Sequence, residues 1–205
     1  MGLYSNLVIP YCIDLAMSGE TLKQYRQQLL KDVSGEILEI GFGTGLNLPH
    51  YPDSVQKITT IDPNPGMKKV ARSRIAASGI DVDNRVLNGE SLPMADASFD
   101  SVVCTWTLCS IPQANQAVSE VYRLLKPGGK FFFIEHGISQ DRAIQIWQNR
   151  LTPIQKIIAD GCHLNRNIKD IVQQKFNNVT VKQFYAPKLP KVIGYMYQGI
   201  AVKPM

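Results

Sequence analysis

Residues 39–45 read Glu-Ile-Gly-Phe-Gly-Thr-Gly and continue the apolar run at residues 36–40. Three glycines therefore alternate at positions 41, 43 and 45. Glycine adopts positive φ without a Cβ penalty, so the chain can turn sharply here while its N–H groups face a ligand. A short strand that runs into such a turn predicts the cofactor site of an α/β protein.

Length and composition limit the classes of protein that are open to this chain. Its 205 residues suit one domain with a well-buried core. No segment approaches the ~20 apolar residues of a membrane span, and the N-terminus has no signal-peptide pattern, so we expect a cytoplasmic protein. The net charge is +5, but the basic residues are scattered, and we expect no nucleic-acid partner.

The four cysteines are Cys12, Cys104, Cys109 and Cys162. They include no Cys-x-x-Cys pair, and no histidine cluster stands at ligand spacing. The sequence therefore predicts reduced thiols and no metal site.

Apolar segments of strand length alternate with segments of helical periodicity. Strands are expected at residues 36–40, 57–62, 83–87, 101–105 and 130–135. Continuous apolar strands favour a parallel sheet covered on both faces, with right-handed crossovers. Residues 179–185 and 195–202 follow one another without a helix. Together these patterns predict a doubly wound α/β fold: a mostly parallel, seven-stranded, Rossmann-like sheet with an antiparallel C-terminal edge hairpin.

Helical segments flank this core on both sides. Pro10 is expected to open a helix at its first turn, and a second helix follows Gly19 with Leu22, Leu29 and Leu30 on one face. We expect residues 1–33 to form a helical lid, 34–136 the cofactor-binding core, and 137–205 the acceptor-side helices and closing strands. The apolar tip at residues 3–9 either packs on the domain as a lid or touches a membrane surface. A helix at 143–159 is expected to be interrupted by Pro153.

Two cofactor classes compete for the glycine loop. The dinucleotide fingerprint requires a small residue at its sixth position, where this chain has Leu46, so a nicotinamide oxidoreductase is disfavoured. Alternating glycines followed by Asn47 suit a nucleoside with an amino-acid tail, such as S-adenosylmethionine. Asp62, at the end of the second strand, is placed to accept hydrogen bonds from ribose hydroxyls. The alternative is a turn carboxylate before Pro63.

Two further strand ends contribute polar groups to the same edge of the sheet. Asn88, Gly89 and Glu90 are expected to read the adenine edge, with Leu92 and Met94 as an apolar wall. Thr105 and Trp106 are expected to line the floor near the sulfonium. Ligands of open α/β sheets bind at the carboxyl ends of strands, where these segments converge.

Several of these segments resemble the successive motifs of class I S-adenosylmethionine-dependent methyltransferases, in that family's order: residues 39–45, 62–63, 89–100 and 125–129. Quinone-biosynthesis C-methyltransferases share this set. A narrower resemblance, to the microsomal alkyl thiol S-methyltransferases, rests on residues 62–65, 103–105, 108–110, 135–136, 160–162, 164–166 and 194–195. That group carries an N-terminal hydrophobic anchor, which this sequence does not clearly show.

The resemblance implies S-adenosylmethionine as methyl donor, S-adenosylhomocysteine as product and no metal. The cofactor contacts that the motifs and strand ends together indicate are Glu39, Gly41, Gly43, Thr44, Gly45, Asn47, Asp62, Pro63, Asn88, Gly89, Glu90 and Thr105. Asn88 stands where many relatives have Asp, and its carbonyl oxygen can still accept a hydrogen bond.

The acceptor side is less well marked. A thiol acceptor must lose its proton, because the thiolate is the nucleophile. His136, after the fifth strand, is the best-placed titratable group, and Asp160 is the second catalytic candidate. Trp106, Cys162 and Arg166 are candidates for the acceptor pocket. The alternatives are that His136 caps a strand end, that Cys162 is a packed hydrophobe, and that Asp160 pairs with Arg166.

The sequence thus predicts an enzyme that methylates a small lipophilic acceptor, with a thiol as the first choice. Methylation at carbon or oxygen of a quinone- or lipid-like acceptor is the alternative within the same class. A cofactor-binding module without catalysis is the alternative from another class. The expected partners are a small-molecule acceptor and, through the N-terminal segment, a membrane surface.

Overall fold

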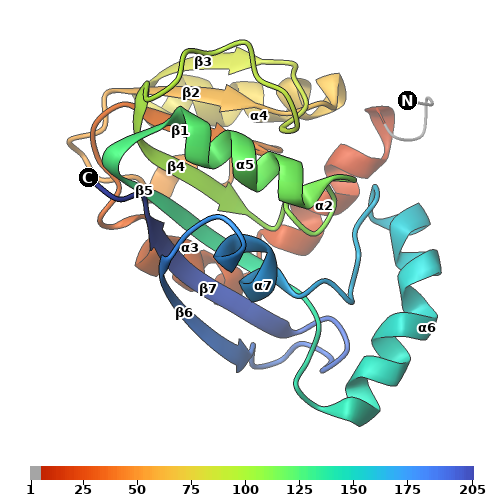
Figure 1. Cartoon of the computed structure of the whole chain (residues 1–205). Helices are drawn as coiled ribbons and strands as arrows, with labels where there is room; N and C mark the ends of the chain where they lie inside the picture. Colours follow the sequence, from red (N-terminus) through yellow and green to blue (C-terminus); the bar gives the residue numbers. More distant parts are fainter. Residues whose placement is uncertain (1–5) are drawn as a thin grey trace.

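The computed structural model describes residues 6–205, and its centre is one seven-stranded sheet with helices on both faces (Figure 1). The strand order is β3-β2-β1-β4-β5-β7-β6, and only β7 runs against its neighbours. The strands are β1 (Ile37–Ile40), β2 (Lys57–Ile61), β3 (Asp81–Arg85), β4 (Phe99–Thr105), β5 (Leu125–His136), β6 (Asn178–Tyr185) and β7 (Tyr195–Val202). The predicted fold class, including the antiparallel hairpin, is confirmed.

The helices are α2 (Ile9–Met17), α3 (Glu20–Leu30), α4 (Pro65–Ser78), α5 (Ala114–Leu124), α6 (Arg142–Ile158) and α7 (Ile168–Gln173), with a short 3₁₀ turn η1 (Leu48–His50). Pro10 lies in the first turn of α2, as expected. The side chain of Asn64 caps α4 by accepting from Gly66 N at 2.9 Å.

Strand β5 shows why continuous apolar runs build a sheet that is covered twice. Phe131 and Phe133 pack into the cluster under α5 and α7, whereas Phe132 and Ile134 pack into the cluster under α3. All four side chains are fully buried. Because successive side chains of a strand point to opposite faces, such a run needs a helical layer on each side.

Several expected boundaries differ from the structure by one to five residues, and β4 begins at Phe99, two residues before its expected start at 101. β3 pairs Lys57 with Asp81 and Ile61 with Arg85, so it lies two residues before its expected position at 83–87. β5 begins at Leu125, five residues earlier than expected. The predicted interruption at Pro153 is wrong, because α6 runs through it. A proline removes one backbone hydrogen bond, which this 17-residue helix tolerates.

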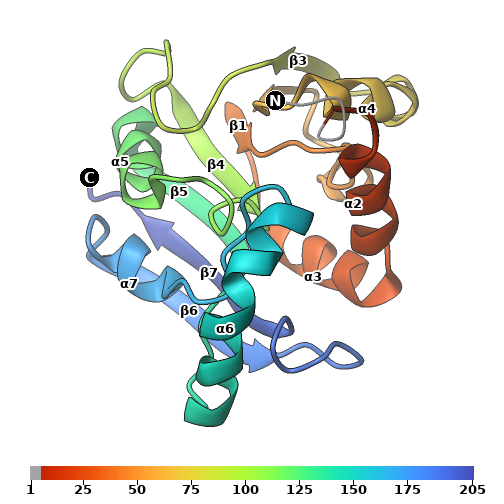
Figure 2. The same ribbon diagram turned by 90° about the vertical axis from the view of Figure 1, so that its right-hand side faces the viewer.

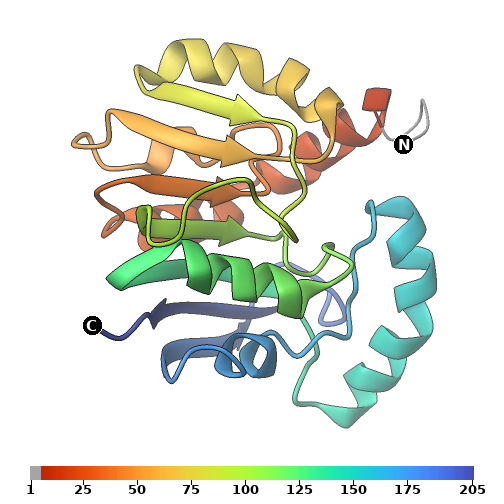
Figure 3. The same ribbon diagram turned by 45° about the horizontal axis from the view of Figure 1, so that its top comes forward.

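The N-terminal segment reaches over the carboxyl ends of the parallel strands (Figure 3). Of the apolar tip at residues 3–9, positions 3–5 lie outside the described residues. Ile9 is buried, whereas Leu7 and Val8 are exposed. Within residues 6–205, no helix is both long enough and apolar enough to cross a membrane.

Candidate active site

A cavity of about 710 Å³ opens at the carboxyl ends of the parallel strands, a volume typical of small-molecule sites. Figure 2 looks onto this end of the sheet, with α2, α3 and α6 around it. The expected site residues that line the cavity are Gly41, Gly43, Thr44, Asn47, Asp62, Pro63, Asn88, Gly89, Glu90, Thr105, Trp106, His136, Asp160 and Cys162. Glu39, Gly45 and Arg166 do not line it.

The three glycines of the loop have the positive φ that the sequence predicts: +77° at Gly41, +56° at Gly43 and +80° at Gly45. A Cβ on Gly41 would stand 1.9 Å from Thr107 Oγ1, so that position also has no room for a side chain. A Cβ on Gly43 would meet no atom closer than 4.0 Å, which leaves this part of the loop open toward the cavity.

The N–H groups of the three glycines, however, do not face a ligand as we expected. Gly41 N donates to Ile61 O at 2.9 Å, and Gly43 N donates to Asp62 Oδ2 at 2.9 Å. Gly45 N donates to Phe42 O within the loop. The amides thus fasten the loop to the end of β2, and the loop offers a ligand a surface free of side chains.

Asp62 combines both roles that the sequence left open. Its Oδ1 accepts from Asn64 N at 2.8 Å, which is a turn contact, yet the residue also lines the cavity. Each carboxylate oxygen keeps a second lone pair for a ligand hydroxyl. Burial raises the pKa of Asp62 to about 6, against the two backbone hydrogen bonds, which lower it.

Glu39 stands behind the cavity wall and positions another residue. Its carboxylate accepts from Asn47 Nδ2 at 2.8 Å and from Tyr51 Oη at 2.7 Å. Asn47 Nδ2 also donates to Thr105 Oγ1 at 3.0 Å, which joins the ends of β1 and β4. Burial raises the pKa of Glu39 to about 7. Glu39 therefore does not line the cavity itself and acts on its wall through Asn47, which does.

The loop after β3 is shaped by its own acidic and amide side chains. Asn88 Oδ1 accepts from Glu90 N at 3.2 Å, and Glu90 Oε1 accepts from Gln113 N at 2.8 Å, just before α5. The expected apolar wall is made by other residues. Leu92 is buried in the core and Met94 packs against it, whereas Leu87 and Ile111 line the cavity.

Arg26 of α3 is a cavity residue that the sequence analysis does not identify. Its guanidinium lies 4.7 Å from the centre of the Trp106 ring, and its Nη1 donates to Met17 O at 2.9 Å. Burial lowers its pKa to about 10, so the side chain stays charged at neutral pH. Trp106 has φ +51°, a conformation rare for a bulky residue and frequent at functional sites.

Four cavity-lining side chains carry a buried polar atom that has no hydrogen-bond partner within residues 6–205. These atoms are Arg26 Nε, Asn47 Oδ1, Trp106 Nε1 and His136 Nδ1. Buried polar groups are normally satisfied, and an unpaired one costs ~1–3 kcal/mol. A polar ligand in the cavity can satisfy them, and these atoms fit a molecule that carries both a nucleoside and an amino-acid group.

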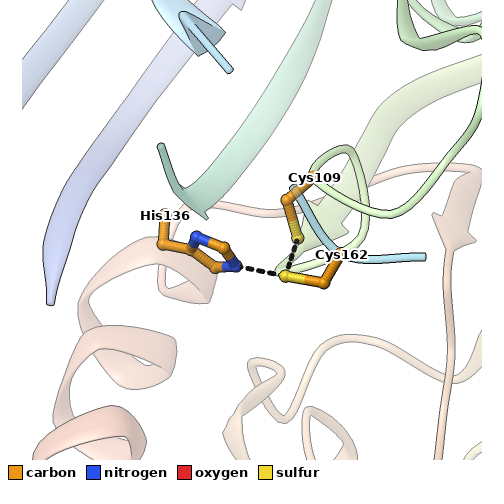
Figure 4. Close-up of side chains that lie close together, drawn as sticks. All are labelled: Cys109, His136 and Cys162. Atoms are coloured by element: carbon orange, nitrogen blue, oxygen red, sulfur yellow. Dashed lines mark hydrogen bonds between the residues drawn. The ribbon is translucent and has the colours of Figure 1, made fainter. Parts of the chain in front are cut away.

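Cys109, His136 and Cys162, hereafter the thiol cluster, face one another at the acceptor end of the cavity (Figure 4). His136 Nε2 lies 2.7 Å from Cys162 Sγ, and the two sulfur atoms are 3.8 Å apart. The contacts with Cys109 and then with His136 lower the pKa of the Cys162 thiol, although burial opposes them. Burial lowers the pKa of His136, but the contact with Cys162 outweighs it, so the pKa is raised.

A buried carboxylate and a half-buried guanidinium hold the loop that carries Cys109. The Glu135 carboxylate accepts from the backbone N–H groups of Thr107, Leu108 and Cys109 at 2.8, 3.0 and 3.2 Å. Arg166 donates to three carbonyl oxygens of the same loop, those of Leu108, Ile111 and Pro112. Arg166 is thus a clamp on this loop and does not line the cavity, and its expected place in the acceptor pocket stays a prediction.

The sequence analysis assigns no role to Cys109, Glu135 or Gln155. Cys109 and Glu135 do stand in the motifs of the narrower resemblance, at residues 108–110 and 135–136, so a signal existed. Gln155, whose Nε2 lies 3.8 Å from Cys162 Sγ, stands in a helix that reads only as an apolar stripe. Arg26 likewise reads as one charge among others on an amphipathic helix.

Comparison with known proteins places the chain among methyltransferases. The family described as "Methyltransferase domain" matches residues 38–133. The thiol S-methyltransferase TMT1B of Rattus norvegicus is 40% identical over 188 residues, which span 85% of this chain and 74% of that protein. The thiol S-methyltransferase TMT1A of Homo sapiens is 36% identical over 178 residues, with 82% and 70% of the two chains covered.

Solved structures show the same fold at low sequence identity. The YcgJ protein of Bacillus subtilis superposes with a TM-score of 0.68 at 17% identity, over 90% of this chain and 98% of that one. The N-methyltransferase NodS of Bradyrhizobium japonicum, solved with S-adenosyl-L-homocysteine, also superposes with a TM-score of 0.68 at 17% identity. The match covers 98% of this chain and 95% of NodS.

Proposed function

We propose that this chain, which belongs to the S-adenosylmethionine-dependent methyltransferases and has thiol S-methyltransferases among its relatives, methylates small lipophilic thiols. The observation that carries the proposal is that one cavity joins two chemically different ends. The glycine loop and Asp62 follow β1 and β2, whereas Cys109 and His136 of the thiol cluster lie beyond β4 and at the end of β5, on the other side of the strand order.

The donor end suits S-adenosylmethionine, which supplies a methyl group already activated on a sulfonium sulfur. Asp62 and Asn88 would hold the ribose and the adenine, beside the bare backbone of Gly43. Arg26 would pair with the carboxylate of the amino-acid tail, because it is the buried cation of this wall and its Nε has no partner within residues 6–205. The task of these residues is to align donor and acceptor and to exclude water.

The acceptor end suits a thiol that reacts as its thiolate. A positive charge on His136 favours an anionic acceptor, and the contacts within the thiol cluster raise the pKa of this imidazole. Asp160, which also lines the cavity, is the second polar group that we assign to this end. We therefore assign His136 and Asp160 to acceptor binding and proton transfer.

The remaining wall explains the preference for a small lipophilic acceptor. Apolar side chains from α2, α3, the segment before β7 and the start of β7 line the cavity: Ile13, Met17, Leu22, Leu189, Ile193 and Met196. Burial of apolar surface contributes ~25 cal/mol per Å², so alkyl and aryl groups on the acceptor would gain affinity here.

Calorimetry and acceptor profiling test the proposal. We expect S-adenosylhomocysteine to bind at one site per chain, and alkyl thiols to be methylated faster than quinol or phospholipid acceptors. If S-adenosylhomocysteine binds and a quinol is methylated but no thiol is, the chain is instead a carbon- or oxygen-methylating enzyme. Absence of binding would refute the donor assignment.

We further propose a cytoplasmic, single-domain enzyme that touches a membrane through the end of the molecule that carries α2 and α6. Tyr11 and Leu15 of α2 are 56% and 81% exposed, and Trp147 and Ile157 of α6 are 53% and 78% exposed. Both helices lie at the end of the sheet where the cavity opens (Figures 1 and 3). Flotation with phospholipid vesicles tests this, and Leu15→Glu combined with Ile157→Glu is expected to abolish it.

A further inference from the structure

The thiol cluster is assembled from three segments that are distant in sequence. Cys109 lies in the loop after β4, His136 ends β5, and Cys162 follows α6. The backbone joins the two cysteine segments directly, because His163 N donates to Cys109 O at 2.9 Å. Both thiols and the imidazole line the cavity.

The spacing within the cluster favours thiol chemistry over metal binding. Two ligands of one tetrahedral zinc, with bonds of ~2.0 Å to nitrogen and ~2.3 Å to sulfur, stand roughly 3.5 Å apart. His136 Nε2 and Cys162 Sγ are 2.7 Å apart, which is closer than two ligands of one zinc ion stand and places the imidazole in direct contact with the thiol. In addition, a histidine that binds a metal is normally held by a hydrogen bond from its second ring nitrogen. His136 Nδ1 has no such partner within residues 6–205.

We propose that Cys162 and Cys109 form a dithiol that cleaves small disulfides inside the acceptor pocket, with Cys162 as the attacking sulfur and Cys109 as the resolving sulfur. The chain would thus use an acceptor in its oxidised form as well as a free thiol. The cleavage itself stands on the cluster alone, and its coupling to methylation rests on the proposed function.

The geometry of the thiol cluster indicates which cysteine attacks and which one resolves. Cys162 contacts His136 and Gln155 and is the less enclosed of the two sulfurs, with 5% of the residue exposed against 1% for Cys109. Cys109 is held in place through its backbone by Glu135 and His163. The sulfur atoms must approach by roughly 1.8 Å, from 3.8 Å to the ~2.0 Å of a disulfide.

The electrostatic environment supports the same division. The hydrogen bond to Cys109 and the neighbouring imidazole lower the pKa of Cys162, so its thiolate is populated at neutral pH. The contact with Cys162 and burial raise the pKa of Cys109 well above its ordinary value. A thiolate paired with a protonated thiol is the arrangement that attacks a disulfide and then resolves it.

The first step forms one sulfur–sulfur bond and breaks another. The Cys162 thiolate attacks the disulfide R–S–S–R, forms Cys162–S–S–R and expels the thiolate RS⁻ beside the His136 imidazolium. That thiolate is already the nucleophile of the proposed methyl transfer, so it needs no separate base. If it is not methylated, it takes the proton of His136 and leaves as RSH.

The second step resolves the mixed disulfide. Cys109 transfers its proton to the leaving sulfur, through His136 when the imidazole is neutral, and attacks Cys162. The products are a Cys109–Cys162 disulfide and a second RSH. Two protein thiols are oxidised while one substrate disulfide is reduced, and two protons pass to the two products. A low-molecular-weight thiol or dithiol must then reduce the protein disulfide.

The test counts thiols released by the full chain in a Cys12→Ser background, which removes the exposed cysteine. The reduced protein, freed of reductant, is mixed with bis(2-hydroxyethyl) disulfide without S-adenosylmethionine. We expect two molecules of 2-mercaptoethanol per chain and a Cys109–Cys162 peptide by mass spectrometry. Cys109→Ser should release one molecule and retain the adduct on Cys162, and Cys162→Ser should release none on the same timescale.

Controls separate chemistry from folding. Cys104→Ser, which changes a buried cysteine outside the cavity, should still release two molecules. His136→Gln should slow the first release at pH 7 by at most roughly 30-fold, because a thiol of ordinary pKa is ~3% thiolate there and the contact with Cys109 remains. Each variant is first shown to bind S-adenosylhomocysteine.

Three results would overturn the proposal. They are release from Cys162→Ser at the parent rate, a parent protein that stops at the mixed disulfide, and stoichiometric zinc in the protein as isolated that is lost in Cys162→Ser. Failure of the proposed function looks different. The two thiols would still be released, but labelled S-adenosylmethionine would methylate neither the released thiol nor added 2-mercaptoethanol.

Discussion

Arg74 Nη1 lies 2.7 Å from Asp14 Oδ1, and this ion pair joins α4 to α2 beside the glycine loop. The same Asp14 oxygen accepts from Thr44 Oγ1 at 2.5 Å, and Arg74 Nη1 also donates to Thr44 O at 3.0 Å. The N-terminal helix is thus fastened to the loop that we assign to the cofactor, and its residue Met17 forms part of the cavity wall.

Loss of this fastening should weaken cofactor binding more than folding. We expect Asp14→Ala to raise the Kd of S-adenosylhomocysteine roughly tenfold, because three polar contacts that hold α2 over the loop disappear together. Titration calorimetry measures the change. Glu20→Ala is the matched control, since it removes only an exposed ion pair with Lys23 and should leave the Kd unchanged. Equal effects of the two variants would contradict the role of Asp14.

The raised pKa of Asp62 predicts how cofactor binding depends on pH. Ribose hydroxyls donate to the carboxylate, so the ligand binds the charged form. Because burial raises the pKa of Asp62 to about 6, protonation below that pH removes the acceptor. Affinity for S-adenosylhomocysteine should therefore be constant above pH 7 and fall up to tenfold per unit below pH 6.

The Asp62→Asn variant tests whether Asp62 causes this pH dependence. The amide keeps one oxygen for Gly43 N but cannot ionise, so affinity should be lower at pH 7 and flat between pH 5 and 7. Other cavity groups titrate in the same region, among them His136. A pH profile that persists unchanged in Asp62→Asn would show that one of those groups, and not Asp62, controls binding.

A third prediction concerns the buried pair Glu39 and Tyr51. Tyr51→Phe removes a hydroxyl that donates to Glu39 Oε2 at 2.7 Å in a fully enclosed site. At pH 8 the Glu39 carboxyl is mostly ionised, because its pKa is about 7. Loss of a buried hydrogen bond to a charged group costs ~1.5–3 kcal/mol, so the free energy of unfolding at that pH should fall by about 2 kcal/mol in urea titrations. Tyr11→Phe, at an exposed position, should change it by less than about 0.5 kcal/mol.

How far the sequence predicts the fold depends on which interaction defines each element. β4 and β5 each contain an apolar run that is buried on both faces, so hydrophobicity marks them, although β5 begins earlier than its apolar run. β3 reads Asp-Val-Asp-Asn-Arg, and its position is set by backbone pairing with β2. Composition carries no signal for such pairing, so β3 was predicted two residues after its actual position.

The site divides in a similar way. Gly43 and Asp62 were found because turn conformation and strand end restrict the residue type at those positions. The sequence analysis did not predict the direction of the Gly41 N–H group, because this group donates to the carbonyl oxygen of Ile61 on a neighbouring strand. The contact between Cys109 and Cys162 links residues 53 positions apart in sequence, and no local pattern encodes it.

The clamp formed by Arg166 gives the last prediction. Its guanidinium donates to the carbonyl oxygens of Leu108, Ile111 and Pro112, and so sets the loop that carries Cys109. We expect Arg166→Lys to be nearly as harmful as Arg166→Ala, because one ammonium cannot reproduce the planar fork that serves three carbonyls. Both variants should lower kcat/KM for thiol methylation about tenfold or more, leave the Kd of S-adenosylhomocysteine within about threefold, and speed amide hydrogen exchange at residues 107–112.

Arg150→Ala, on the exposed face of α6, is the matched control and should cause none of these three changes. Unchanged exchange in the loop alongside a lost rate would instead mean that Arg166 meets the acceptor itself.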